Sequence, residues 1–522
     1  MKILTAAEMQ RIDRLTTDRC GIPSLTLMEN AAQRVVEFLA EHYAPLDHQR
    51  ITILCGRGNN GGDGLAVARL LRGLGLSPRI VLFADPSKVR GDAAANLDRY
   101  KSYWPVSIVQ TVEEWEKLKP EIADATLIVD AMLGTGLSKP LEGLLLKVVQ
   151  DLNAASAASK VVAVDLPTGL SADSGQLIGE CLRAGASVTF TAPKHSHVFP
   201  PACEQVGKWV VRGIGTPDEL LESDPDLFLD LTQPEDLTWL NLSRPMDSHK
   251  GNFGHVLVVA GSVGKTGAAA MAAKAVLRAG AGLVTVATPR SALASVAGFG
   301  MEFMTEPLPE TKDGTISLEA LKGSLLERIL EGKTVLAIGP GLGSHPETKE
   351  FVRKVVDEVD LPVVLDADGL NAFAGHVDRI QPRGRIRILT PHPGEMSRLT
   401  GMGTRELMDR RFEVAREFAM SHDVVVVLKG SRTLIAAPSG RVAVNPTGNP
   451  GMATGGTGDC LTGLIAGLCA QFRSRPVEAV TAAAVYLHGR AGDIAAARQG
   501  QASMIAGDLL EAIPEAFQRL AG

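Results

Sequence analysis

The sequence predicts an α/β protein built from two open, mostly parallel sheets. Short apolar segments recur along the chain, each followed by a turn rich in glycine and polar residues and then by a helical segment, which is typical of parallel strands joined by helices. The composition agrees, because 45% of the 522 residues are hydrophobic and 54 are glycine, whereas only 4% are aromatic. Periodicity is lost over residues 213–240, where acidic residues and prolines gather. We therefore expect two domains, residues 1–215 and 236–522, joined by a linker at residues 216–235.

The charge and the cysteine content exclude several classes of protein. A formal net charge of -6 argues against non-specific binding of nucleic acid and suits a soluble cytoplasmic protein. The six cysteines form no CxxC pair, so neither a zinc site nor a disulfide framework is indicated. The amino-terminal segment turns polar too early for a signal peptide, and no apolar run is long enough to span a membrane. We expect small-molecule ligands, and neither a membrane nor a nucleic-acid partner.

The first half begins with two helices and a strand. Apolar residues at three- and four-residue spacing predict helices over residues 6–18 and 24–42, and an apolar run predicts a strand over residues 51–55. A loop, GRGNNGGDG at residues 56–64, follows and contains the pattern GxGxxG, and a helix is expected over residues 65–74. This order is that of a dinucleotide-binding fold, so a nicotinamide-dependent dehydrogenase is one hypothesis.

The glycine-rich loop is longer and more polar than the turn of a dehydrogenase. Asn59, Asn60 and Asp63 lie close together in it. Their amides and carboxylate can bind the sugar or the nicotinamide amide of a ligand, or coordinate a hard cation. We therefore interpret residues 56–64 as a binding loop rather than as a flexible connection.

Two later strands end in the same kind of turn. One strand ends at Asp130 and leads into AMLGTGLSKP, and the next leads into DLPTG, which begins at Asp165 and contains Thr168. The carboxyl ends of parallel strands meet at one crevice of the sheet. We therefore expect these three residues to share one pocket with Asn60.

A pair of histidines follows the strand at residues 188–190. His195 and His197 are two residues apart, so in a strand they would share one face. No third residue has the spacing of a metal ligand. We interpret the two as ordinary histidines of a loop or a pocket rim.

The second half repeats the alternation of strands and polar turns. A strand at residues 256–260 leads into GSVGKTGA, which resembles a Walker A loop but has Val259 where that motif needs its first glycine. A P-loop NTPase is therefore excluded. The turn still opens an Ala-rich helix at residues 268–279, and its glycines suit a close approach of the main chain to a ligand. Four further strands lead into GPGLG, DADGLN, TPHPGE and KGSRT, and they are expected at residues 335–338, 363–365, 386–389 and 424–428.

The turn NPTGNPGMATGGTGDCLTG, at residues 445–463, is the strongest candidate for a reactive site. The apolar run at residues 460–472 predicts a buried helix, which places Asp459 in its first turn. Glycines leave backbone N–H groups exposed and the helix N-terminus is partly positive, so the turn suits phosphate and favours ionised Asp459. That carboxylate could take a proton from a hydroxyl beside the phosphate. The alternative is that Asp459 only caps the helix.

Two other polar residues stand at strand ends of the second half. His392 lies between prolines in a rigid turn, where it can cap a helix or contact a ligand. Lys429, beside Gly430, can attract the phosphates of a nucleotide or simply be solvated. With Asp459 they are expected to complete one pocket at the carboxyl ends of the strands.

The motifs together resemble two known families. GNNGGDG, VDAMLGTG and DLPTG are similar to the NAD(P)H-hydrate epimerase family. GSVGKTGAA, GPGLG, LDADGLN, LTPHPGEM, LKGSRT and NPTGNPGMATGGTGDCLTG are similar to the NAD(P)H-hydrate dehydratase family, a branch of the ribokinase-like fold. Their order resembles the bacterial bifunctional NAD(P)H-hydrate repair enzymes, in which the two are fused. The resemblance covers nearly the whole chain except the linker and the carboxyl-terminal end.

The resemblance implies a Rossmann-like first domain that acts on a damaged cofactor. The substrate is a reduced nicotinamide nucleotide with water added across a ring double bond, and the domain interconverts the R and S epimers at the hydroxyl-bearing carbon. Asp165 would carry the acid–base chemistry. A potassium ion would contact Asn60, Asp130 and Thr168, the last standing where the family more often has Ser. The residues that would bind the hydrate are Asn59, Asn60, Gly61, Gly62, Asp63, Gly134, Thr135, Gly136, Leu137, Ser138, Lys139, Pro140 and Asp165.

The same resemblance implies a ribokinase-like second domain that dehydrates the S epimer, with ADP as co-substrate and Mg²⁺. ADP would phosphorylate the ring hydroxyl, and phosphate, a better leaving group than hydroxide, would depart to restore the double bond. Asp459 would deprotonate the hydroxyl while the N–H groups of residues 456–458 stabilise the phosphoryl group. The expected hydrate contacts are Ala268, Gly343, His392 and Asp459. The expected nucleotide contacts are Lys429, Gly430, Ser431, Arg432, Thr433 and Gly458.

Rival functions remain open from the sequence. An NAD-dependent dehydrogenase would use the first glycine-rich loop but not the turn that contains Asp459. A ribokinase-type small-molecule kinase would use the second half and leave the first without a role. A nucleotide sensor without catalysis would use the same motifs. For the assembly, we expect a homo-oligomer.

Overall fold

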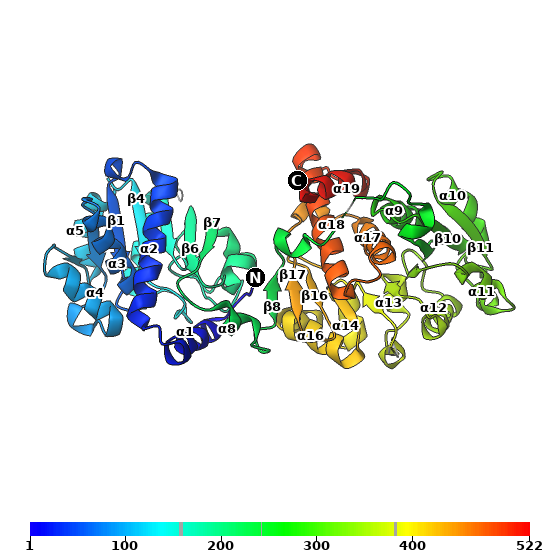
Figure 1. Cartoon of the computed structure of the whole chain (residues 1–522), viewed down its shortest axis with the longest axis horizontal. Coiled ribbons are helices and arrows are strands. Elements are labelled where there is room, and N and C mark those ends of the chain that lie inside the picture. The colour runs from blue at the N-terminus through cyan, green and yellow to red at the C-terminus, as the bar shows by residue number, and fades with distance from the viewer. Residues whose placement is uncertain (156–159, 242, 381–383, 522) are drawn as a thin grey trace. The chain divides into compact units, whose positions relative to one another are not determined.

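The computed structural model describes residues 1–155, 160–241, 243–380 and 384–521, and the chain divides into two compact units (Figure 1). Unit 1 is Met1–Leu227 and unit 2 is Phe228–Gly522. Each unit has its own sheet and its own apolar core, so the predicted fold class of two mostly parallel α/β domains is confirmed. None of the described helices is long and apolar enough to cross a membrane.

The described residues of unit 1 form a seven-stranded sheet in the order β3-β2-β1-β4-β5-β6-β7. Each pair of neighbours is parallel. The chain starts in the middle of the sheet and extends it in both directions, and the carboxyl ends of β1 and β4 flank the point at which the order reverses, where open α/β sheets bind ligands. The strands are β1 Ile51–Cys55, β2 Arg79–Leu82, β3 Ser107–Ile108, β4 Leu127–Ala131, β5 Val161–Val164, β6 Ala186–Phe190 and β7 Lys208–Arg212.

Helices cover both faces of this sheet. Ile53 of β1 belongs to a core shared with α2 and α3, whereas Leu54 belongs to a second core with Trp115 of α5 and Val149 of α6. Because both faces are buried at the centre of the sheet, strands such as β1 and β5 are apolar almost throughout rather than alternating. The helices are α1 Ala6–Cys20, α2 Ser24–Tyr43, α3 Asn59–Gly73, α4 Gly91–Lys101, α5 Val112–Ile122, α6 Gly143–Ala155, α7 His195–Val198 and α8 Asp218–Glu222, with short 3-10 turns η1 Leu46–His48, η2 Pro86–Lys88 and η4 Ala202–Glu204.

Helix α3 begins at Asn59 rather than at residue 65. The loop predicted over residues 56–64 is therefore wrong for most of its length. The reason is that its glycines serve close packing: a Cβ on Gly64 would lie 2.6 Å from the Cβ of Ala131 on β4. Glycine thus allows the first turns of α3 to lie against the sheet, and the polar residues between the glycines occupy the start of a helix.

The described residues of unit 2 form a ten-stranded sheet in the order β11-β10-β9-β12-β13-β14-β15-β16-β17-β8. Neighbours from β11 to β15 are parallel, whereas β16 is antiparallel to both β15 and β17. The edge strand β8 is parallel to β17. The strands are β8 Leu229–Leu231, β9 His255–Val259, β10 Leu283–Pro289, β11 Met304–Leu308, β12 Val335–Ile338, β13 Val363–Leu365, β14 Arg387–Leu389, β15 Val425–Leu428, β16 Leu434–Ala436 and β17 Val442–Val444.

Helix α17 is buried continuously from Cys460 to Ala470 and packs closely on α9. A Cβ on Gly463 would lie 2.1 Å from the carbonyl oxygen of Ala272, so only glycine fits there. The other helices of unit 2 are α10 Leu293–Ala297, α11 Leu325–Leu330, α12 Pro346–Glu358, α13 Asp368–Asn371, α14 Pro393–Thr400, α15 Thr404–Asp409, α16 Arg411–His422, α18 Val477–Gln499 and α19 Ala506–Ala521, besides α9 Thr266–Arg278 and α17 Thr457–Gln471. Its 3-10 turns are η5 Pro234–Leu237, η6 Lys250–Phe253, η7 Arg290–Ala292, η8 Leu318–Leu321, η9 Val377–Ile380 and η10 Pro450–Met452.

The segment expected to be a linker, residues 216–235, contains regular structure. Helix α8 belongs to unit 1, and β8 belongs to the sheet of unit 2. The residues directly before and after β8 also form hydrogen bonds with β17: Val442 N donates to Phe228 O at 2.8 Å and Thr232 N donates to Val444 O at 3.0 Å. The compact units therefore meet in sequence between residues 227 and 228.

Candidate active sites

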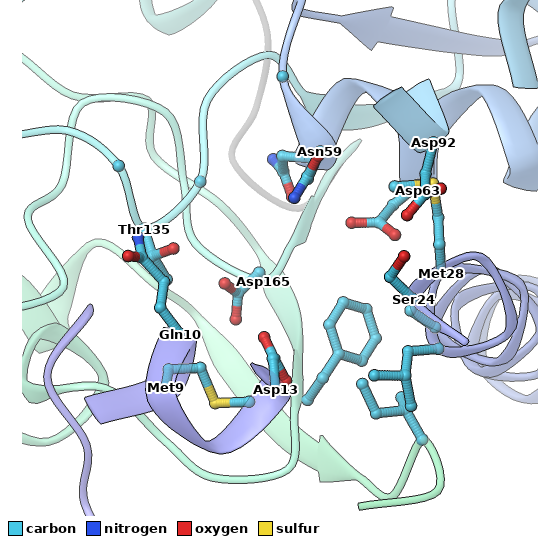
Figure 2. A pocket seen from close by; sticks show the side chains of 18 of the residues that line it. Met9, Gln10, Asp13, Ser24, Met28, Asn59, Asp63, Asp92, Thr135 and Asp165 are labelled. Atoms are coloured by element: carbon cyan, nitrogen blue, oxygen red, sulfur yellow. The ribbon is translucent and has the colours of Figure 1, made fainter. Parts of the chain in front are cut away.

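Unit 1 holds a pocket of about 650 Å³ at the carboxyl ends of β1, β4 and β5 (Figure 2). Helix α1 supplies another part of its wall, including Met9 and Asp13. Of the residues expected to bind the hydrate, those that line the pocket are Asn59, Asn60, Asp63, Gly134, Thr135, Gly136, Leu137 and Asp165.

The remaining residues of that expected set do not line the pocket. Gly61 and Gly62 are buried in α3, where a Cβ on Gly62 would lie 2.8 Å from the Cε of Met28. Residues 138–140 continue the turn beyond the pocket wall and are exposed. The two glycines thus serve the packing of α3.

Asp165 is held in place by a buried lysine and a threonine. Its Oδ1 accepts hydrogen bonds from Lys194 Nζ at 2.6 Å and from Thr189 Oγ1 at 2.7 Å. Burial by itself raises the pKa of Asp165, but the charge and hydrogen bond of Lys194, together with His197 and Thr189, outweigh burial and keep the pKa below its ordinary value. Its φ of 62° is a conformation that costs on the order of 1–3 kcal/mol and is characteristic of functional sites. Asp165 is therefore an oriented, ionised carboxylate.

One of the two histidines, His197, holds the main chain of this site in place. His195 and His197 are buried in α7 and not at a rim, which corrects their predicted position. Lys194 N donates to His197 Nδ1 at 3.0 Å, so Nε2 carries the hydrogen and donates to the carbonyl oxygen of Asp165 at 2.9 Å. Burial lowers the pKa of His197 to about 4, so the ring is neutral. Among the described residues, no group of three or more His, Cys, Asp or Glu side chains could hold a metal ion.

Two further carboxyl groups share the pocket with Asp165. Burial raises the pKa of Asp13 to about 6. The charge of Lys194 lowers this pKa, whereas the charge of Asp165 raises it further. Burial also raises the pKa of Asp63 well above its ordinary value, and the charges of Asp165 and Asp13 add to the effect. Figure 2 shows all three side chains around one space. Sequence reasoning missed Asp13, whose only signal was an acid next to the buried Ile12 of an amphipathic helix.

The residues expected at a potassium ion are joined by a chain of hydrogen bonds. Asp130 accepts from the hydroxyl and the amide of Thr168, both at 2.7 Å. Leu133 N donates to Thr168 Oγ1 at 3.0 Å, and Asn60 Nδ2 donates to Leu133 O at 3.0 Å. Asp130 and Thr168 are fully buried, and of the three only Asn60 lines the pocket. Burial raises the pKa of Asp130 to about 6, although the bonds from Thr168 oppose this rise.

Unit 2 holds a pocket of about 410 Å³ beside the end of β15 and the start of α17. The segment from Asn445 to Ala453 and His488 of α18 form much of its wall. All residues expected to bind the nucleotide line it: Lys429, Gly430, Ser431, Arg432, Thr433 and Gly458.

Asp459 lies in the first turn of α17, as predicted, but it does not cap the helix. The helix begins at Thr457 and its N-cap is Gly456, which has a φ of 94°. Burial raises the pKa of Asp459 to about 7, with the charge of Asp366 adding and that of Lys429 opposing. The expectation of a readily ionised carboxylate is thus corrected, because burial and nearby carboxylates outweigh the helix N-terminus. A carboxyl group with a pKa near neutrality is suited to act as a general base.

A buried network centred on Asp366 joins α17 to the ends of β13, β14 and β15 beside Asp459. Asp366 Oδ1 accepts from Lys429 Nζ and from Thr390 Oγ1, both at 2.8 Å, and its Oδ2 accepts from Thr462 Oγ1 at 2.8 Å. Burial alone would lower the pKa of Lys429, but the charges of Asp366 and Glu395 outweigh burial and raise the pKa. Lys429 is therefore a charged lysine that pairs with Asp366 and lines the pocket, with only 20% of its side chain exposed, and not a freely solvated one.

Gly343 and His392, which were expected to contact the hydrate, adjoin this network. Gly343 N donates to Asp368 Oδ2 at 2.8 Å, and the charge of Asp368 acts on Asp459. His392 is the N-cap of α14, and its Nδ1 accepts from the N–H groups of Gly394 and Glu395. Its role in the structure is therefore helix capping, with half of the side chain exposed.

Ala268, the fourth of these residues, lies in the first turns of α9. It faces the GPGLG turn, since a Cβ on Gly341 would lie 3.1 Å from the Cβ of Ala268. The adjacent Lys265 pairs with Asp368, Nζ to Oδ2, at 3.2 Å. The Walker-like turn thus reaches the same network through its lysine.

Comparisons with known proteins agree for both units. A family model described as NAD(P)H-hydrate dehydratase matches residues 256–515, and one described as YjeF-related protein N-terminus matches residues 24–196. The bifunctional NAD(P)H-hydrate repair enzyme Nnr of Moorella thermoacetica is 44% identical, with 100% of this chain and 97% of that protein covered. The enzyme of the same name from Thermofilum pendens is 38% identical with the same coverage. The one from Escherichia coli is 34% identical, with 97% of this chain and 92% of that protein covered.

Among the solved structures that this chain resembles is a dehydratase. It is the ADP/ATP-dependent NAD(P)H-hydrate dehydratase from Bacillus subtilis, co-crystallised with ATP and Mg²⁺. It is 34% identical, the match covers 56% of this chain and 98% of that chain, and the TM-score is 0.48. Because relatives that share one name match both halves in one continuous alignment, the chain belongs to the family of bifunctional NAD(P)H-hydrate repair enzymes.

Proposed function

We propose that this chain repairs hydrated NADH and NADPH in two steps. Residues 1–215 would interconvert the R and S hydrates, and residues 236–522 would return the S hydrate to the reduced nucleotide with ADP. The observation that carries the proposal is that each compact unit has its own pocket, lined in unit 1 by most of the expected hydrate contacts and in unit 2 by all of the expected nucleotide contacts, next to Asp459. A dehydrogenase or a small-molecule kinase would leave one of the two pockets unused.

Epimerisation requires acid–base chemistry at one ring carbon. The hydroxyl of the hydrate is on the carbon next to the ring nitrogen, because an enamine adds water at the carbon bonded to nitrogen. If the hydroxyl leaves as water, the nitrogen lone pair forms a planar C=N bond, and water that attacks the other face inverts the centre. Asp165, ionised beside Lys194, is suited to take a proton from that attacking water.

A potassium ion in unit 1 would be held by Asn60, Asp130 and Thr168. Their amide, carboxyl and hydroxyl oxygens are the donor type that hard cations prefer. Asp130 is fully buried, and only hydrogen bonds from Thr168 and Met132, not a cationic side chain, lower its pKa. The residues therefore fit a cation, which would supply positive charge beside this carboxyl group.

Dehydration requires a base and a charge-stabilising turn. Asp459 would take the hydroxyl proton as ADP transfers its terminal phosphoryl group, leaving AMP. Phosphate would then depart and the neighbouring ring carbon would lose a proton to solvent, which restores the double bond. The exposed N–H groups at the start of α17 and the charge of Lys429 are suited to the phosphates, because a Cβ on Gly458 would lie only 3.5 Å from Lys429 Nζ. Mg²⁺ would accompany the nucleotide, bound chiefly by phosphate oxygens and water.

The test uses a mixture of R and S hydrates of NADH with Mg²⁺, K⁺ and either ADP or ATP. The near-ultraviolet absorbance of the dihydronicotinamide ring reports repair. Complete recovery with ADP is expected, since the dehydratase alone stops when the S hydrate is exhausted. Recovery that stops partway would contradict the epimerase assignment. No recovery with either nucleotide would contradict the whole proposal and favour a small-molecule kinase.

We further propose that the protein is a cytoplasmic homo-oligomer. The net charge of -6 supports the compartment. Sedimentation velocity at micromolar concentration measures the assembly directly. A species with the mass of one chain, 55.1 kDa, would contradict the oligomer.

A further inference from the structure

Helix α1 brings a carboxyl group to the epimerase pocket from outside the recognised motifs. The family model for this unit begins at residue 24, whereas α1 ends at Cys20. Asp13 of α1 lines the pocket, and its Oδ1 is buried without a hydrogen-bond partner among the described residues. A buried oxygen in that situation is unfavourable unless a ligand or water contacts it.

The segment that carries Lys194 also fixes the position of α1. Leu4 N donates to Pro193 O at 2.9 Å, and Leu4 forms a parallel β-bridge with Lys194. Ala6 N, at the start of the helix, donates to Asp173 Oδ1 at 2.6 Å. The segment at Pro193 and Lys194 therefore does two things. It places Lys194 against Asp165, and it holds the start of α1 so that the inner face of the helix is turned toward Asp165.

The two carboxyl groups are unlike each other. Lys194 and Thr189 both donate to Oδ1 of Asp165, so among the described residues no hydrogen bond is made to its Oδ2. Among the described residues, no lysine donates a hydrogen bond to Asp13, and burial raises the pKa of Asp13 to about 6. Figure 2 shows both side chains extending into one space. A pair of carboxyl groups in which one stays ionised and the other gains and loses a proton not far below neutral pH is an arrangement that acid–base catalysis uses.

We propose that Asp13 is the second proton-transfer residue of the epimerase, opposite Asp165; this rests on the proposed function of unit 1. Protonated Asp13 gives its proton to the ring hydroxyl, the C–O bond breaks, water leaves, and the nitrogen lone pair forms C=N. A water molecule attacks the other face and forms the new C–O bond while Asp165 takes its proton, and the C=N electron pair returns to nitrogen. One water is lost, one is gained, and nothing is oxidised.

The two residues exchange roles with the direction of reaction. After one turnover Asp13 is ionised and Asp165 is protonated, which is the state that the reverse conversion needs. Proton exchange with water restores the first state. A reversible epimerase is therefore served by two carboxyl groups that share one proton.

The test is Asp13→Asn in the full chain, with interconversion of the hydrates followed by chromatography. We expect kcat for epimerisation to fall about 100-fold or more while KM changes little. Dehydration of pure S hydrate by unit 2 should keep its rate, and an unchanged thermal unfolding transition of unit 1 shows that unit 1 is folded. Asp13→Glu should restore part of the activity, and the surface variant Asp98→Asn should match the unaltered chain, because Asp98 is exposed and pairs only with Lys101.

The pH profile separates catalysis from support of the fold. The charged groups that face Asp13 are Lys194, Asp165 at the end of β5 and Asp63 of α3. Epimerisation by the unaltered chain should fall at low pH as Asp165 gains a proton and at high pH as Asp13 loses one. Asp13→Asn should abolish the fall at high pH.

The outcomes distinguish this inference from the proposed function. If the unaltered chain epimerises the hydrate and Asp13→Asn retains its kcat, Asp13 is not a proton-transfer residue, and the epimerase assignment stands. A change in KM alone would likewise contradict the role in proton transfer. If the unaltered chain does not epimerise the hydrate at all, the proposed function of unit 1 fails first.

Discussion

Among single residues, Asp459 shows how burial can bring the pKa of a carboxyl group into the range that a general base needs. A carboxylate accepts a proton best when its pKa is close to the working pH. Burial and the charge of Asp366 raise the pKa of Asp459 to about 7 despite the opposing charge of Lys429. The same carboxyl group therefore changes its protonation within the physiological range.

Asp459→Ala should lower the rate of dehydration by roughly 10²–10⁴-fold and leave epimerisation intact. In the unaltered chain, kcat for dehydration should rise with pH through about 7, because the base must lose its proton. Pure S hydrate with saturating ADP isolates this step. Equal loss of both activities in Asp459→Ala would indicate misfolding.

A second substitution, Asp368→Asn, tests whether the pKa of Asp459 sets this pH profile. It removes a negative charge that raises the pKa of Asp459, so the rise in kcat should move to lower pH. An unchanged midpoint would show that Asp459 does not set the profile.

Lys194→Met should destabilise unit 1 through Asp165. Removing one partner of a buried ion pair typically costs about 3–5 kcal/mol, and Lys194 is only 1% exposed. The pKa of Asp165 is depressed by Lys194, so this pair stabilises the fold above the ordinary pKa of an aspartate and loses that effect as pH falls. The difference in unfolding free energy between the two chains should therefore shrink toward acid pH, as urea unfolding can measure.

The control for this substitution is Lys119→Met. Lys119 pairs with Asp151 at 2.9 Å but is 36% exposed, so its loss should cost less than about 1 kcal/mol. A comparable loss in both variants, or a loss in Lys194→Met that does not depend on pH, would contradict the argument.

Residue roles could be predicted from the sequence where a local motif determines them. Asp165 and Asp459 stand at a strand end and a helix start, and both positions are readable from the surrounding residues. Asp13 and Lys194 were not assigned roles, because their importance depends on contacts with residues far away in the sequence. The pKa of Asp459 was misjudged for the same reason: Asp366 approaches it from another strand.

Among the elements, the pair α9 and α17 places the reactive turn of unit 2. Gly463→Ala should destabilise unit 2, because the added Cβ would lie 2.1 Å from the backbone oxygen of Ala272 and the helices must separate. Overpacking of this kind typically costs about 1–3 kcal/mol. Both the melting temperature of unit 2 and the dehydration rate should fall, since α17 carries Asp459.

Gly507→Ala is the matched control within the same unit. Gly507 is exposed in α19, and only the side chain of Ile505 comes within 4 Å of an added Cβ. Alanine should therefore be neutral or stabilise the helix by up to about 1 kcal/mol. If the two substitutions lowered the melting temperature equally, close packing of α17 would not be the cause.

The elements were predictable where burial leaves an uninterrupted apolar run. Strands at residues 51–55 and 335–338 agree with β1 and β12. The start of α3 was missed because glycine usually signals a turn, whereas here it permits contact with β4. Short strands such as β16 and β17 carry too few residues for a periodic pattern, and their hairpin was not anticipated.

In the whole molecule, the two proposed activities reside in separate compact units. A mixture of two full-length variants, Asp165→Asn and Asp459→Ala, should therefore restore complete repair of the mixed hydrate. Alone, the first should recover only the S portion and the second none. Recovery of absorbance with ADP measures each case.

This experiment also tests whether the hydrate travels through solution. If the mixture stops at the S portion, although each variant keeps its remaining activity, the hydrate must pass between sites of one chain. The order of the motifs predicted both activities from the sequence. The junction was harder to predict, because α8 and β8 are short and acidic and show no periodicity.

The strand β8 has a consequence for biosynthesis. It is the first strand of unit 2 to leave the ribosome, yet its partner β17 follows only at Val442–Val444. At about 5–20 residues per second, β8 waits on the order of 10–40 s before that partner exists. A strand of three residues with Asp230 at its centre offers little to a neighbouring nascent chain. The order of translation thus favours a first strand that is too short and too polar to pair with a strand of a neighbouring chain.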